Sequence, residues 1–123
     1  MFDYPRKPKP ATQSPRFKLR IGSGRPIMMD LEAFGWLLVG RKTEKEDDEG
    51  LGLDLTPFGG LEKGVSRNHA AFSYMEGGIY IEDLGSTSGT RVNGLPLKPN
   101  QKYHLRHNDE IEFGSVRVVV VLN

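Results

Sequence analysis

Two short segments of the sequence combine hydroxyl groups, glycines and a guanidinium. The first covers residues 65–68 and contains Ser66 and Arg67, and the second covers residues 85–89 and contains Thr87. Hydroxyl, backbone N–H and guanidinium donors together suit an oxyanion with several acceptor atoms, above all a phosphate. The rest of the chain must then supply a rigid scaffold that brings both segments to one place.

Two catalytic interpretations of these segments fail on their chemistry. Ser66 as a nucleophile with His69 as its base would need a buried acid behind the histidine, and no nucleophile-elbow pattern surrounds the serine. The second segment, GSTSGT, has two glycines as a nucleotide-binding P-loop has, but the lysine of such a loop and the helix after it are missing. We expect no enzyme activity, and we expect His69 to brace its loop through hydrogen bonds.

A metal site is also considered, because His104, His107 and Asp109 lie close together in the sequence. Their spacing is not that of a known metal motif, and the segment has the composition of a surface turn. We expect these residues to be ordinary exposed polar groups, and we expect neither a metal nor another cofactor.

Composition narrows the class of protein further. The 123 residues suit one domain, 37% of them are hydrophobic, and the formal net charge of +1 does not indicate a nucleic-acid binder. The absence of cysteine excludes disulfides, thiolate-bound zinc and a cysteine nucleophile, and it fits a cytoplasmic location. The apolar run near the C-terminus, residues 118–122, is too short to insert into a membrane, and no apolar signal segment opens the chain.

Residues 1–16 differ from the rest of the chain. They contain half of the eight prolines of the chain, interleaved with basic residues. This composition predicts a flexible tail or linker. The folded domain is then expected to cover residues 17–123. Thr12 within this tail suggests a further hypothesis, in which the phosphorylated threonine folds back onto the phosphate site and inhibits it.

From Phe17 onward the pattern is that of short strands. Apolar and polar residues alternate, Gly, Pro and Asn mark the turns, and no long run has the 3.6-residue period of a helix. Residues 34–39 (FGWLLV) form an apolar run that predicts a central strand covered on both faces. The other expected strands include residues 17–21, 53–55, 69–74, 79–83, 90–92, 103–105, 111–113 and 116–122. The fold class is therefore all-β, an antiparallel sandwich or barrel.

Four ordered motifs resemble the forkhead-associated (FHA) domain family. They are Gly40-Arg41, Ser66-Arg67-Asn68-His69, the segment from Asp83 to Thr90 followed by Val92-Asn93-Gly94, and Asn108-Asp109 followed by Ile111-Glu112-Phe113-Gly114. The resemblance covers nearly the whole chain after the tail. It implies an antiparallel β-sandwich of about eleven strands whose loops at one end bind phosphothreonine peptides.

The resemblance also implies roles for individual residues. Arg41 would contact the phosphate, Ser66 would donate its hydroxyl to it, Arg67 would add a second cation or a peptide contact, and Thr87 would help to hold the phosphothreonine. The implied supporting residues are Gly40, His69, Gly89 and Asn93. Ser88 stands where many members have an asparagine that bonds the peptide backbone, which affects affinity and selectivity beyond the phosphate but not the class of ligand.

The resulting hypothesis is a phosphothreonine-binding module in Ser/Thr kinase signalling. Its partner would be a Thr-phosphorylated protein or peptide, such as a Ser/Thr kinase or a kinase substrate. The alternative is a scaffolding β-domain that binds its partner without phosphate through the faces of the sandwich.

Overall fold

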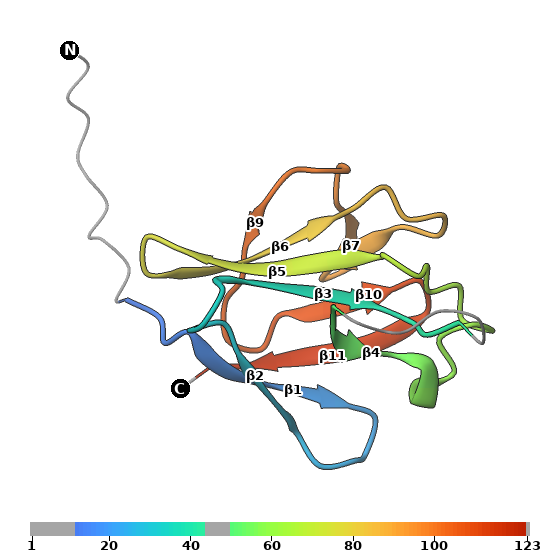
Figure 1. Cartoon of the computed structure of the whole chain (residues 1–123), viewed down its shortest axis with the longest axis horizontal. Coiled ribbons are helices and arrows are strands. Elements are labelled where there is room, and N and C mark those ends of the chain that lie inside the picture. The colour runs from blue at the N-terminus through green and yellow to red at the C-terminus, as the bar shows by residue number, and fades with distance from the viewer. Residues whose placement is uncertain (1–11, 44–49, 123) are drawn as a thin grey trace.

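The chain forms two β-sheets packed face to face, in a computed structural model that describes residues 12–43 and 50–122 (Figure 1). The strands are β1 (Arg16–Ile21), β2 (Ile27–Asp30), β3 (Trp36–Gly40), β4 (Leu51–Asp54), β5 (Ala70–Met75), β6 (Gly78–Asp83), β7 (Thr90–Val92), β8 (Leu95–Pro96), β9 (Tyr103–His104), β10 (Glu110–Phe113) and β11 (Val116–Val121), and the short 3-10 helix η1 (Thr56–Phe58) follows β4. One sheet has the order β2-β1-β11-β10-β7-β8 and the other the order β4-β3-β5-β6-β9. The predicted all-β sandwich is confirmed.

Alternation along each strand places apolar side chains between the two sheets. In β11 Val116, Val118 and Val120 are buried while Arg117 is exposed. A slip of one residue in register would turn these valines to solvent, so burial fixes the pairing of β11 with its neighbours. Neighbouring strands run antiparallel, except that β3 and β4 are parallel.

Three phenylalanine rings join the sheets at the centre of the core. Phe72 of β5 lies 5.3 Å from Phe17 of β1 and 6.3 Å from Phe113 of β10, measured between ring centroids. All three side chains are fully buried. Tilted and edge-on aromatic contacts of this kind add about 0.5–1.5 kcal/mol each beyond the burial of their area.

The prediction that residues 34–39 are covered on both faces is wrong. The strand starts only at Trp36, after a turn in which Gly35 has a φ of 65°. Phe34 is 90% exposed and Trp36 46% exposed, whereas Val39 is fully buried. β3 does lie inside its sheet, but only one face of that sheet packs on the core, so an apolar run alone does not show how many faces are covered.

β5 and β6 form the hairpin that the sequence predicts around residues 75–78. Its turn residues Glu76 and Gly77 both have positive φ, 49° and 76°, as a tight turn between twisted antiparallel strands requires. The hairpin turn lies at the end of β5 opposite to the end that follows His69.

Ordered structure begins before the predicted boundary at Phe17. Residues 1–11 of the predicted tail lie outside the described residues, but Gln13 makes hydrogen bonds to the sheet. Its amide Oε1 accepts from the Ile79 N–H at 2.7 Å and its Nε2 donates to the Leu105 carbonyl at 2.8 Å. Since the Leu105 N–H also donates directly to the Ile79 carbonyl, the Gln13 amide replaces one peptide group in a backbone ladder.

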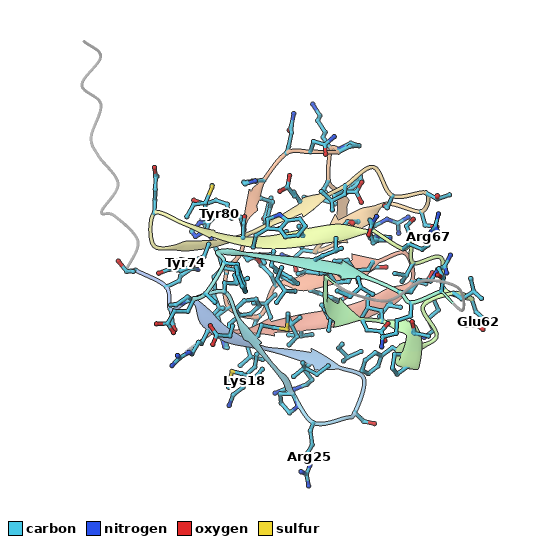
Figure 2. The ribbon with its side chains drawn as sticks, viewed as in Figure 1. Lys18, Arg25, Glu62, Arg67, Tyr74 and Tyr80 are labelled. Atoms are coloured by element: carbon cyan, nitrogen blue, oxygen red, sulfur yellow. The ribbon has the colours of Figure 1, made fainter. Side chains whose placement is uncertain are left out.

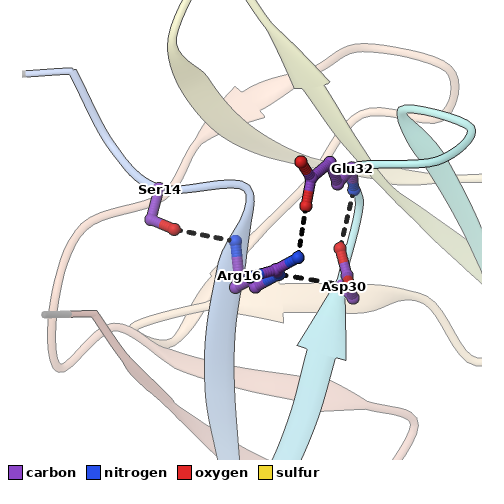
Figure 3. A network of polar contacts seen from close by, with 4 residues as sticks. All are labelled: Ser14, Arg16, Asp30 and Glu32. Atoms are coloured by element: carbon purple, nitrogen blue, oxygen red, sulfur yellow. Dashed lines mark hydrogen bonds and ion pairs between the residues drawn. The ribbon is translucent and has the colours of Figure 1, made fainter.

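A small polar network holds the entry to β1 (Figure 3). The Arg16 guanidinium pairs with Asp30 at 3.3 Å and with Glu32 at 2.5 Å, and the Arg16 N–H donates to the Ser14 hydroxyl at 3.1 Å. Because these side chains are exposed, the ion pairs add little stability. Their effect is to fix the start of β1 against β2.

Among the described residues no helix is long and apolar enough to cross a membrane.

Candidate functional site

Strand topology brings the two hydroxyl-rich loops, residues 65–68 and residues 85–89, to one end of the sandwich. The first loop leads into β5, and the second connects β6 to β7. β5 and β6 are antiparallel neighbours, so the start of β5 and the end of β6 lie together, with Ala70 opposite Asp83. The end of β3 lies at the same place, because Val39 is opposite Ala70.

His69 ties the two loops together from inside the protein. Its Nδ1 accepts from the Ser66 N–H at 2.9 Å, so its Nε2 carries the proton and donates to the Gly89 carbonyl, also at 2.9 Å. The ring is fully buried and meets the Phe113 ring edge-on, with 5.8 Å between centroids. Burial lowers the His69 pKa, although the Gly89 carbonyl and the charge of Asp83 act in the opposite direction, and the neutral ring is the form that makes both bonds.

Ser66 connects the loops a second time at the surface. The Thr87 N–H donates to the Ser66 Oγ at 3.1 Å. This bond uses a lone pair of the oxygen and leaves the hydroxyl proton available to an acceptor outside the protein. Ser66 is half-buried, and Thr87 is exposed beside it.

Arg41 is held over the first loop. Its Nε donates to the Val65 carbonyl at 2.6 Å, and within the described residues the terminal amino groups of the guanidinium are left for other acceptors. The preceding Gly40 permits this close approach, since a Cβ at that position would lie 1.7 Å from the Arg67 carbonyl oxygen. Any larger residue at position 40 would push the first loop away from β3.

Asp83, which the sequence analysis did not select, organises the second loop. Its carboxylate accepts from the N–H groups of Gly85 and Ser86 at 3.0 Å, from the Ser86 hydroxyl at 2.6 Å and from the Thr90 hydroxyl at 2.7 Å. Burial alone would raise the Asp83 pKa, but these hydrogen bonds from Ser86, Thr90 and the backbone together lower it. The signal was present in the sequence, because an aspartate before a Gly- and Ser-rich turn commonly accepts such local bonds.

Gly89 and Ser88 complete the contact between the loops. Gly89 has a φ of 84°, and its carbonyl accepts from the Gly114 N–H as well as from His69. Ser88 is exposed, and its hydroxyl packs against Gly64, where an added Cβ would lie 2.5 Å away. Of the residues implied by the family resemblance, the structure thus brings together Gly40, Arg41, Ser66, Arg67, His69, Thr87, Ser88 and Gly89.

Asn93 does not join this group. It follows β7, at the end of that strand away from Gly89. Its side chain donates to the Asp109 carboxylate at 2.9 Å and accepts from the Glu110 N–H at 2.9 Å. Asn93 therefore joins the β7–β8 turn to the start of β10, at the opposite end of the sandwich.

The three residues considered as metal ligands make separate contacts. His104 bonds the Gln13 amide oxygen at 3.0 Å, the His107 Nδ1 accepts from the Leu122 N–H at 2.9 Å, and Asp109 accepts from the Arg106 N–H at 2.8 Å. Within residues 12–43 and 50–122 no group of three or more His, Asp or Glu side chains is arranged to hold a metal ion.

Comparison with protein families matches the FHA domain model to residues 37–114, which contain both loops and Arg41. Among curated proteins, Protein FraH of Nostoc sp. is 40% identical over 70 residues, covering 57% of this chain and 24% of FraH. The probable E3 ubiquitin-protein ligase dma1 of Schizosaccharomyces pombe is 35% identical over 83 residues, covering 64% of this chain and 30% of the ligase. The chain thus spans less than a third of the length of either relative.

Solved structures share the whole architecture. The MEK1 FHA domain in complex with a phosphothreonine peptide of HOP1 is 30% identical, with a TM-score of 0.62 over 89% of this chain and 98% of that domain. An FHA domain solved in a study of phosphothreonine-dependent interactions is 26% identical, with a TM-score of 0.65 over 88% of this chain and 97% of that domain.

Proposed function

This chain belongs to the FHA domain family of protein-interaction modules, and we propose that it binds phosphothreonine peptides without catalysing a reaction. The observation that carries the proposal is the convergence of donors at one end of the sandwich. The Arg41 guanidinium is anchored on Val65, and the Ser66 hydroxyl is oriented by the Thr87 N–H. A relative of the same fold, the MEK1 FHA domain, has been solved with a phosphothreonine peptide of HOP1, which supports the same ligand class here.

Phosphate chemistry fits these donors. A phosphothreonine carries close to two negative charges near neutral pH and three strong acceptor oxygens. Each charge-assisted hydrogen bond to it contributes about 1.5–3 kcal/mol. Arg41 and Ser66 together therefore make the phosphate the main determinant of binding, with Arg67 and Thr87 as further contacts in the proposed complex.

The proposal is tested by titrating an oriented phosphothreonine peptide library and its unphosphorylated counterpart. We expect binding to the phosphorylated library alone, and a loss of about 2–5 kcal/mol for Arg41→Ala, as for removal of one member of a desolvated charge pair. Arg106→Ala, at an exposed turn of the opposite end, is the matched control and should bind normally. Normal binding by both Arg41→Ala and Ser66→Ala would show that the site lies elsewhere.

The proposed partner is a Thr-phosphorylated protein, such as a Ser/Thr kinase or one of its substrates. Affinity should fall as the pH drops through the second phosphate pKa of about 6, because the dianion then becomes a monoanion. A phosphopeptide with a charge-neutral surrogate in place of the phosphate should lose binding at every pH.

A second candidate is phosphate-independent scaffolding, which one observation favours. Phe34, Trp36 and Met75 are 90%, 46% and 40% exposed at the end of the sandwich opposite to the loops. Phosphatase treatment of a captured partner separates the two functions. A complex that survives dephosphorylation would indicate that this apolar surface, and not the loops, holds the partner.

A further inference from the structure

The outer face of the β4-β3-β5-β6-β9 sheet carries a row of aromatic side chains that takes no part in the site described above. Trp36 of β3 is paired with Ser73 of β5, and Ser73 with Tyr80 of β6. Tyr80 is paired in turn with His104 of β9. Because Phe72 of β5 packs into the core, the next residue and its partners on neighbouring strands face the opposite way.

This row presents ring surface to solvent. Ser73 is small and only 4% exposed, so the larger side chains around it form the surface of the row. Trp36 is 46% exposed, and Met75, which lies two residues further along β5, is 40% exposed. The half-buried rings of Tyr80 and His104 stack, with 5.0 Å between their centroids. Together Trp36, Met75, Tyr80 and His104 form what we call the aromatic surface.

The described part of the chain begins beside this surface. Thr12 lies against Gly77 in the β5–β6 turn, where an added Cβ would be 2.9 Å from the Thr12 methyl group. The Gln13 N–H donates to the Gly77 carbonyl at 2.8 Å, which fixes this position. Figure 2 shows Tyr80 toward this end of the sandwich and Arg67, in the first loop of the phosphate site, toward the other.

We propose that the aromatic surface is the docking site for residues 4–10 of this same chain, YPRKPKP, which lie outside the described residues. Pro5 and Pro8 are three residues apart, and a polyproline II helix has three residues per turn, so it would place both rings on one side, about 9 Å apart. Trp36 and Tyr80 lie on strands two apart in the sheet, which separates them by about 9–10 Å. The two spacings match, so each proline ring would cover one aromatic ring.

The length of the chain fits the same arrangement. Four residues separate Pro8 from Thr12, a reach of about 12 Å in polyproline II form. Gly77, against which Thr12 lies, is three residues from Tyr80, or about 10 Å along the hairpin. Pro8 would therefore lie over Tyr80, and the residues before it would continue across the sheet.

Charge favours the same segment. Residues 4–10 contain three cations, Arg6, Lys7 and Lys9, and no acid. Glu76 follows Met75 in the turn, is exposed, and among residues 12–43 and 50–122 forms no ion pair. Lys9 is the cation nearest in sequence to the attachment point at the turn, so we assign it to the Glu76 carboxylate.

Fluorescence of the full chain tests this proposal, because Trp36 is the single tryptophan. We expect acrylamide to quench Trp36 at least about twofold less efficiently in the wild type than in a Pro5→Ser/Pro8→Ser variant, since a surface occupied in most molecules shields the ring in proportion to its occupancy. Pro26→Ser/Pro96→Ser, at two exposed positions associated with the other sheet, is the matched control and should be quenched as the wild type is.

Charge reversal tests the orientation of the segment. Lys9→Glu and Glu76→Lys should each increase the quenching of Trp36, by a smaller factor than the loss of both prolines, because an exposed ion pair is weak. The double variant Lys9→Glu/Glu76→Lys should restore the protection. Arg25→Glu, which makes the same change in net charge as Lys9→Glu but in the exposed β1–β2 turn, should have no effect.

Two results would overturn the proposal. Equal quenching of the wild type and the Pro5→Ser/Pro8→Ser variant, with circular dichroism showing both to be folded, would mean that residues 4–10 do not cover Trp36. Protection that increases with protein concentration would mean that a second copy supplies the segment, which contradicts docking within one chain. Protection that is independent of concentration and lost in the proline variant is the expected outcome.

Discussion

Replacement of His69 by leucine tests whether one buried histidine holds the two loops together. Leucine keeps an apolar side chain against Phe113 but offers no hydrogen-bonding atom. The variant therefore loses the bonds to the Ser66 N–H and the Gly89 carbonyl, each 2.9 Å long in the native protein. The carbonyl retains the Gly114 N–H as a partner, whereas the Ser66 N–H loses its acceptor.

The magnitude follows from these contacts. Two hydrogen bonds contribute about 0.5–1.5 kcal/mol each, and an unsatisfied N–H costs a further 1–3 kcal/mol or so where water cannot reach it. Ser66 is only half-buried, so we expect the lower part of that range and a total loss of about 2–4 kcal/mol in the free energy of unfolding. Binding of a phosphothreonine peptide should fall at least about tenfold, because the Ser66 hydroxyl is no longer fixed beside Thr87.

Urea unfolding of the wild type and the variant measures the free energy of unfolding, and calorimetric titration measures the affinity for the phosphothreonine peptide. Arg106→Leu, which changes an exposed side chain at the opposite end, should alter neither the free energy of unfolding nor the free energy of binding by more than about 0.5 kcal/mol. A His69→Leu protein with wild-type stability and wild-type affinity would refute the role of His69 as the link between the loops.

Three further predictions concern Gly40, Gln13 and pH. Gly40→Ala should lower the free energy of unfolding by about 1–3 kcal/mol in urea, because its Cβ would meet the Arg67 carbonyl at 1.7 Å and displace the loop. Gln13→Ala should lower the free energy of unfolding by about 1–3 kcal/mol and speed hydrogen exchange at the Ile79 amide, because the side chain that bridges Ile79 and Leu105 is lost. Folding lowers the pKa of both His69 and Asp83, so each takes up its proton at a higher pH in the unfolded chain than in the folded protein. The urea midpoint should therefore fall as the pH drops below about 6.5, because of His69, and fall further below about 4, because of Asp83.

Matched changes control for these effects. Gly24→Ala places its Cβ 3.6 Å from the nearest carbonyl, an ordinary contact, and should leave stability unchanged. Gln101→Ala removes an exposed amide and should do the same. The pH prediction fails if the His69→Leu protein shows the wild-type fall in stability between about pH 7 and 5.

The alternation of apolar and polar residues was enough to predict an all-β fold, a sandwich or a barrel, and the family resemblance implied the sandwich. The apolar positions along a strand are the positions that become buried, and burial decides which side of the strand faces the core, as the valines of β11 show. The same pattern carries no information on hydrogen bonds made by a single polar side chain. Gln13 lies in a proline-rich segment without periodicity, and its place in the β6 ladder depends on partners 66 and 92 residues away.

The Gln13 contacts also bear on the hypothesis of an inhibitory phosphorylated Thr12. Thr12 lies against Gly77, in the β5–β6 turn at the end of the sandwich opposite to the loops. To reach the phosphate site of its own chain, the segment would have to break the five hydrogen bonds of Gln13 to Gly77, Tyr74, Ile79, His104 and Leu105. The docking of Gln13 on the sheet therefore opposes that form of autoinhibition.

The composition of the site was more predictable than its geometry. Ser66, Thr87 and Arg41 are recognisable by type and motif, and the structure brings them together. The role of Asp83 depends on four hydrogen bonds inside one loop, and the remote position of Asn93 depends on which end of β7 each loop joins. The position of Asn93 requires the sheet topology, which a local pattern does not contain, whereas the Asp83 bonds are local and an aspartate before a Gly- and Ser-rich turn was a signal for them.

The most direct test of phosphate recognition is a calorimetric titration with one peptide in two forms. The phosphothreonine form and the unphosphorylated form are compared on the wild-type protein and on Arg41→Ala, near neutral pH. We expect the wild type to bind the phosphorylated form alone, and the Arg41→Ala protein to bind it more weakly by about 2–5 kcal/mol. Equal affinity of the wild type for both forms would contradict a phosphate site at these loops.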